Sequence, residues 1–170
     1  MGFGGDFTLT DQNGQSFSSK KLRGKVVFLF FGYTSCPHIC PATMSRLEKV
    51  YELLGKKRGN LTRSLETVFI TVDPEKDTPA VLKAFLAKYN IKATGLTGSE
   101  KEIKKTVKRY QGLFEKRPKH KQAKGERVDH TSFVYLLDRK GQVVSLFRDG
   151  EKPVKIARVT LRALLTSARR

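Results

Sequence analysis

Cys36 and Cys40 are the only cysteines of this chain, and three residues separate them. Two thiols this close can form a disulfide, or they can bind a soft metal ion as a pair of thiolates. Their spacing is one residue longer than that of the Cys-x-x-Cys redox motif. A single bridge over so short a loop would add little stability, so redox or metal chemistry is favoured over a structural role.

Three histidines could complete a metal site. His130 lies just before a predicted strand, where a histidine by itself is more often structural or exposed. In a thioredoxin-like fold this loop would lie beside the cysteines, and we therefore take His130 as the third ligand. His38 lies between the cysteines and is interpreted first as an exposed loop residue, and otherwise as a fourth ligand or a cation that lowers the pKa of the thiols. His120 is taken as a surface residue. Two thiolates and one neutral imidazole suit Cu(I) better than hard ions, whereas zinc usually needs four ligands.

The cysteines follow a continuous apolar run over residues 26–31, which is typical of a central strand covered on both faces. Apolar residues at helical spacing then predict a helix from Pro41 to about Gly55. The pair therefore lies at a strand-to-helix junction, where the helix dipole would favour thiolates. The pattern also predicts a hairpin over 7–17, a strand over 68–72, helices over 79–89 and 99–110, an extended piece near Leu96, a hairpin over 132–147 and a helix over Pro153–Thr166.

Two acidic residues, Asp73 and Asp77, follow the second apolar strand. We expect them at the same edge of the sheet as the cysteines, where each could hold His130 or a nearby loop in place. For Asp77, helix capping or turn formation is an equally good explanation.

The order of these elements predicts an α/β fold with a mixed central sheet flanked by helices, an N-terminal β-hairpin and an inserted basic loop over 114–127. It resembles the thioredoxin-like fold, in which the loop carrying His130 lies beside the cysteine loop. The sequence has no repeat and no domain linker, so we expect residues 1–170 to form a single domain.

The net charge of +18, from 34 Lys and Arg against 16 Asp and Glu, predicts attraction to an acidic partner or an anionic surface. Nucleic-acid binding is not expected, because the aromatic residues fall at core spacing and do not interleave with the basic runs. A peroxidase of the peroxiredoxin type is also disfavoured, because Leu29 and Tyr33 stand where that family carries Pro and Thr.

Three blocks resemble the signature of the SCO/SenC family: YTSCPHICP at 33–41, VDPEKDTP at 72–79 and VDHT at 128–131. The resemblance implies copper, as Cu(I) and also Cu(II), bound by Cys36, Cys40 and His130, with Asp73 as a supporting residue. His38 departs from the family, whose members commonly carry Asp there, and we treat it as a modulator of the site.

The resemblance implies a copper metallochaperone, without turnover of its own, that helps to assemble the dinuclear copper centre of cytochrome c oxidase subunit II. The alternative is a thiol-disulfide oxidoreductase that reduces the target's cysteines through Cys36 and Cys40. We expect a monomeric domain that an N-terminal segment, missing from this chain, anchors to a membrane. The domain is expected to face the bacterial periplasm or, alternatively, the mitochondrial intermembrane space. A second copper chaperone is an expected partner, and the basic segment 116–127 is expected to steer docking.

Overall fold

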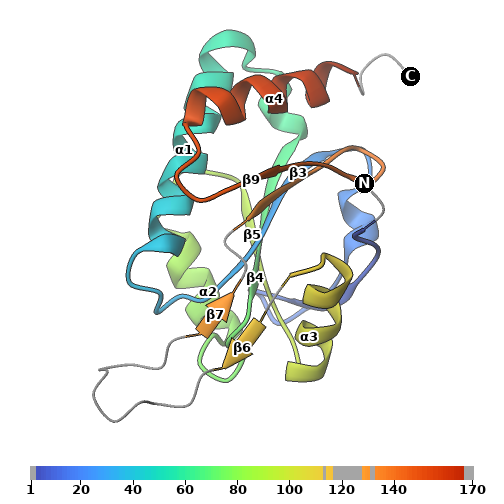
Figure 1. Cartoon of the computed structure of the whole chain (residues 1–170), viewed down its shortest axis with the longest axis vertical. Helices are drawn as coiled ribbons and strands as arrows, with labels where there is room; N and C mark the ends of the chain where they lie inside the picture. The colour runs from blue at the N-terminus through green and yellow to red at the C-terminus, as the bar shows by residue number, and fades with distance from the viewer. Residues whose placement is uncertain (1–2, 113, 117–127, 131–132, 167–170) are drawn as a thin grey trace.

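The computed structural model describes residues 3–112, 114–116, 128–130 and 133–166 (Figure 1). The side chains of Arg58 and of residues 114–116 and 128–130 lie outside the described part. The elements in chain order are β1 (Thr8–Asp11), β2 (Ser16–Ser18), η1 (Ser19–Leu22), β3 (Val26–Gly32), α1 (Ile39–Arg58), η2 (Leu61–Ser64), β4 (Leu65–Thr71), α2 (Pro79–Leu86), β5 (Ala93–Thr97), α3 (Glu100–Arg109), β6 (Phe114–Lys116), β7 (Val128–His130), β8 (Val134–Leu137), β9 (Val143–Phe147) and α4 (Pro153–Thr166).

Seven of the strands form one mixed sheet in the order β2-β1-β5-β4-β3-β8-β9. The three central strands, β5, β4 and β3, run parallel, and β8 joins β3 in the antiparallel direction. Gly32 is in register with Thr71, so the ends of β3 and β4 lie side by side. The predicted mixed sheet flanked by helices is confirmed, and the cysteine loop leaves it from a central strand.

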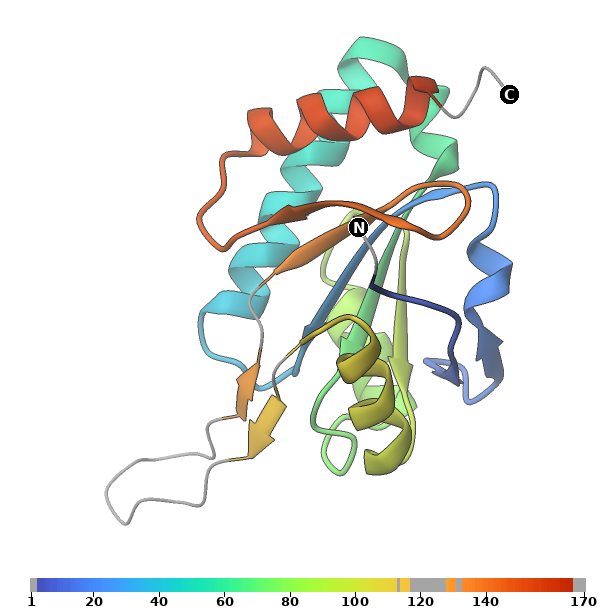
Figure 2. The ribbon, with the colours of Figure 1, turned by 45° about the vertical axis from the view of Figure 1, so that its right-hand side comes forward.

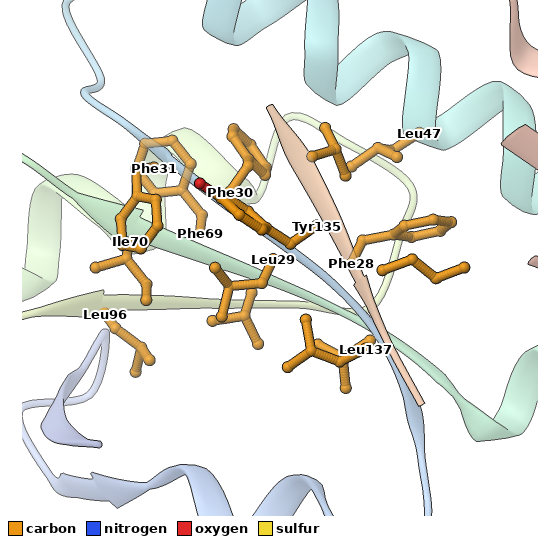
Figure 3. Packing of buried hydrophobic residues seen from close by; sticks show 14 of the residues in the cluster. Phe28, Leu29, Phe30, Phe31, Leu47, Phe69, Ile70, Leu96, Tyr135 and Leu137 are labelled. Atoms are coloured by element: carbon orange, nitrogen blue, oxygen red, sulfur yellow. The ribbon is translucent and has the colours of Figure 1, made fainter. Parts of the chain in front are cut away.

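Both faces of β3 are buried, as its apolar run predicted. Phe28 lies edge to face against Tyr51 of α1, while Phe31 meets Tyr110 at the end of α3. Because alternate residues of a strand point to opposite faces, α1 and α3 cover opposite faces of the sheet, as Figure 2 shows. Phe28, Leu29, Phe30 and Phe31 thus each contribute to a core on one side of the sheet or the other (Figure 3).

Local signals in the sequence placed most helix boundaries correctly. The Thr78 hydroxyl accepts the N–H of Val81 at the start of α2, and Ser99 and Glu102 form the predicted capping box of α3. Helix α1 differs from the prediction, because it begins at Ile39 and continues through Gly55 to Arg58. A glycine inside a helix costs only about 1 kcal/mol, which packing of a long helix readily offsets.

The interpretation of residues 114–127 as a loop is wrong at its first three residues. Phe114–Lys116 forms strand β6, which pairs antiparallel with Val128–His130, strand β7, in a separate two-stranded sheet. Strands of three residues are too short to show an alternating pattern, so the sequence carried no usable signal for them. Residues 117–127, with His120 and most of the predicted basic loop, lie outside the described residues.

Candidate metal and redox site

The two cysteines lie where the connection from β3 meets α1. Cys36 follows a turn in which its N–H donates to the carbonyl of Tyr33 at 3.2 Å, and Cys40 lies in the first turn of α1. Neither cysteine is in a disulfide, and both are buried, with exposed fractions of 7% for Cys36 and 1% for Cys40. The fold therefore holds two reduced sulfur atoms together beneath a short surface loop.

Gly32, the last residue of β3, makes room for one of these sulfurs. A Cβ atom at position 32 would lie 2.7 Å from the Sγ of Cys40 and 2.9 Å from Cε2 of Phe69. Atoms of real side chains do not approach this closely, so only glycine fits between the sheet and α1 here. The absence of a side chain at the strand end is thus what allows the Cys40 thiol to lie directly against the sheet.

A buried carboxylate ties the cysteine loop to the neighbouring strand. Asp77 accepts the backbone N–H of Thr34 at 2.9 Å and the Thr34 hydroxyl at 2.5 Å. It also accepts the hydroxyl of Thr71, the last residue of β4, at 2.7 Å. The sequence offered capping, turn formation or loop support for Asp77, and its side chain performs the last of these. Its main partner is 43 residues away in the chain, so local signals could not identify it.

The electrostatics at Cys40 favour a protonated thiol when no metal is bound. Burial raises the pKa of the Cys40 thiol far above its ordinary value, and the charge and hydrogen bond of Cys36 act in the same direction. The sequence led us to expect a helix N-terminus that favours thiolates, but at Cys40 the cost of desolvation is larger. A cation that replaces the proton would remove this penalty, because thiolates are the metal-binding form.

We expect the two reduced thiols to react at different rates with a small alkylating agent. Cys36 is the more exposed of the two, and Cys40, in the first turn of α1, lies against Gly32. A short pulse of iodoacetamide followed by peptide mass spectrometry should label Cys36 several-fold faster than Cys40 in the folded domain. In denaturant the two rates should converge, and faster labelling of Cys40 in the folded domain would contradict this arrangement.

The other predicted site residues lie around the same end of the sheet. His38 is exposed, as the loop interpretation expected, and its side chain caps no helix N–H. Asp73 is buried two residues after the end of β4, and its N–H donates to the hydroxyl of Thr71 at 3.0 Å. The backbone of His130 pairs with Phe114 in the β6–β7 sheet, and Figures 1 and 2 both show β7 beside the connection from β3 to α1.

The imidazole of His130 lies outside the described side chains, so its ligand role stays a prediction. Among the side chains that the structure describes, no group of three or more His, Cys, Asp or Glu residues is placed to hold a metal ion. The described part of the site is therefore a buried dithiol with a supporting carboxylate.

A mixed sheet flanked by helices, with two reduced cysteines where a central strand leads into a helix, defines a thioredoxin-like domain with a dithiol site. The sequence model of the SCO1/SenC family matches residues 2–165. The chain belongs to the SCO1/SenC family, which confirms the predicted resemblance and the thioredoxin-like fold.

Two relatives illustrate the match in sequence. The SCO2-like protein of Rickettsia felis is 37% identical over 153 residues, which are 90% of this chain and 73% of that protein. The mitochondrial protein SCO1 of Saccharomyces cerevisiae is 40% identical over 141 residues, which are 83% of this chain but 47% of that protein.

Solved structures agree with this assignment. The copper-bound structure of Bradyrhizobium japonicum ScoI superposes with a TM-score of 0.81 at 37% identity, covering 95% of this chain and 99% of that one. BsSco, a member of the Sco family of cytochrome c oxidase assembly proteins in which a disulfide switch is described, superposes with a TM-score of 0.73 at 26% identity, covering 99% of this chain and 95% of that one. The described part of the present chain contains no helix that is both long and apolar enough to cross a membrane.

Proposed function

We propose that this domain is a copper metallochaperone that carries Cu(I) on Cys36, Cys40 and His130 and serves the assembly of cytochrome c oxidase. The observation that carries the proposal is the pair of buried cysteines at the β3–α1 junction, neither of which is in a disulfide. Strand β7, which ends at His130, lies beside this junction, and this placement and the copper bound to the related ScoI support the proposal. Two sulfur donors and one imidazole form a soft donor set, which suits Cu(I).

In this proposal copper is the cargo, and the protein controls when the thiols carry charge. Burial keeps the Cys40 thiol protonated until Cu(I) arrives, and binding then releases the thiol protons. Cys36 is nearer the surface, so its bond to copper would be exchanged first for a thiolate of the acceptor. Asp77 fixes Thr34, two residues before Cys36, to the end of β4. Asp73 is proposed to support His130. The acceptor would be the dinuclear copper site of oxidase subunit II.

Anaerobic Cu(I) titration against a chromophoric competitor tests the ligand set. We expect Cys36→Ser, Cys40→Ser and His130→Ala each to weaken Cu(I) binding by about a hundredfold or more, because even residues that only support ligands are worth 10- to 100-fold. His120→Ala is the matched control, since it removes an imidazole outside the proposed ligands. Unchanged affinity in His130→Ala would contradict the three-ligand site, and His38→Ala measures whether that residue modulates it.

The second candidate is a thiol-disulfide oxidoreductase, favoured by the two reduced, adjacent cysteines and by the disulfide switch described for BsSco. The Cys36 thiolate would attack the target disulfide, and Cys40 would then resolve the mixed disulfide, leaving a reduced target and an oxidised Cys36–Cys40 pair. This chemistry needs both cysteines but not His130. Full oxidase assembly in cells that carry only His130→Ala would favour it over copper delivery.

The setting of the domain is part of the same proposal. Relatives of this chain include a mitochondrial protein. We propose that an N-terminal segment anchors the domain to a membrane and that the domain itself lies in the aqueous space beside that membrane. The bacterial periplasm is the proposed compartment, with the mitochondrial intermembrane space as the alternative. Fractionation of cells that express the full natural gene product tests this, because an anchored protein stays with the membranes after a salt wash.

A further inference from the structure

The outward side of α4 carries both basic and apolar side chains. Positions 154, 158, 162 and 165 follow one another at spacings of four, four and three, which puts them on one stripe of the helix. The opposite side is buried through Ile156, Thr160 and Leu164. We call the outward surface, together with the adjoining last turn of α1, the α1/α4 face, and it consists of Lys57, Val154, Arg158, Leu161, Arg162 and Leu165.

The charge of the α1/α4 face is positive and largely unneutralised. Helix α4 contains no acidic residue. In the part of the chain that the structure describes, Lys57, Arg158 and Arg162 take part in no ion pair, whereas the neighbouring Lys155 is paired with Glu151 at 3.1 Å. Unpaired surface cations of this kind attract an anionic surface, and their effect is strongest where they are grouped.

The same face exposes apolar side chains. Val154 is 58% exposed and Leu165 is 37% exposed, so two of the five exposed large aliphatic residues of the described chain lie on this one helix. Between them and α1 runs a shallow groove of about 160 Å³, to which Leu53, Leu54, Ala157 and Leu161 contribute. Cations interleaved with aliphatic side chains on the outside of a helix are typical of contact with a lipid headgroup region.

We propose that the α1/α4 face binds the surface of a membrane that contains anionic lipids. An acidic protein could satisfy the cations, but it would not account as well for aliphatic side chains placed between them. Figures 1 and 2 show α4 across the C-terminal end of α1, while the cysteines lie at the opposite end of that helix. Because an α-helix rises about 1.5 Å per residue, Cys40 would lie roughly 25 Å along α1 from Lys57. The cysteine site would therefore be at the end of the domain that is distant from the lipid.

Vesicle co-sedimentation of the domain tests this docking. The wild type should bind vesicles of phosphatidylcholine with phosphatidylglycerol, bind phosphatidylcholine alone far less, and release with rising salt. Arg158→Glu with Arg162→Glu should weaken binding by about tenfold or more, since each lost cation near the surface costs about fivefold. The control is Lys101→Glu with Lys105→Glu, which reverses two exposed cations at the same spacing on α3. It should keep most of the binding.

Equal losses in the two double variants would overturn the proposal, because they would show that net charge alone drives the contact. No binding of the wild type to anionic vesicles would overturn it too, and would leave an acidic protein as the occupant. Because the chain has no tryptophan, the fluorescence of one introduced tryptophan can report whether its position inserts into the lipid. Val154→Trp should shift its emission to the blue on anionic vesicles, while Val81→Trp, at a position on α2 that is also exposed, should not. The reverse pattern would refute the assigned face.

Discussion

Replacing Asp77 with alanine is expected to loosen the cysteine loop and to destabilise the whole domain. The substitution removes the acceptor of three hydrogen bonds and leaves the Thr34 and Thr71 donors without it. Losing a buried, charged acceptor of this kind should lower the free energy of unfolding by about 3 kcal/mol. Cu(I) affinity should fall by about tenfold or more, because the turn that leads into Cys36 is no longer fixed to β4 through Thr34.

Two further variants separate the role of Asp77 from a general effect of removing a charge. Asp77→Asn keeps one oxygen acceptor and should fall between the wild type and Asp77→Ala in both measurements. Asp149→Ala removes a carboxylate that pairs with Arg46 at 3.2 Å on the surface, and it should cost at most about 1 kcal/mol. Chemical denaturation and Cu(I) titration of the three variants check this order, and an Asp77→Ala domain as stable as Asp149→Ala would contradict the assigned role.

Features with a local cause could be predicted from the sequence. The strand over Val26–Gly32 is a continuous apolar run, and the caps at Thr78 and Ser99 depend on residues three positions away. The start of α1 was missed by two residues because Pro41, which suits a first turn, stands after Ile39 and Cys40. Strand β6 was missed because three residues carry no period and their pairing partner comes after eleven further residues.

The site divides in the same way. The cysteine pair and the strand-to-helix junction were visible, because both depend on neighbours in the chain. The partners of Asp77 and the close approach of Gly32 to Cys40 were not visible, since they arise only when β3, β4 and α1 pack together. The high pKa of the Cys40 thiol was missed for the same reason: the helix terminus can be predicted from sequence, but the burial that outweighs it cannot.

Among substitutions that add a single methyl group, Gly32→Ala is expected to disturb the cysteine site most. The added carbon would lie 2.7 Å from the Cys40 Sγ and 2.9 Å from the ring of Phe69, so either the thiol or the β3–α1 packing must shift. Overpacking a core in this way typically costs 1–3 kcal/mol. Because the sulfur itself is displaced, Cu(I) affinity should fall by about tenfold or more, as expected when a ligand leaves its fitted geometry. Denaturation and Cu(I) titration measure the two effects.

Gly55→Ala provides the matched control, since it adds the same methyl group to the same fold. Gly55 lies within α1, and a Cβ atom there would meet nothing within 4 Å. Alanine should therefore raise the free energy of unfolding by about 0.5–1 kcal/mol through its higher helix propensity and leave Cu(I) binding unchanged. Opposite signs of the stability change in the two variants would show that the space at Gly32 is reserved for the Cys40 sulfur, whereas a Gly32→Ala domain with normal stability and affinity would refute this role.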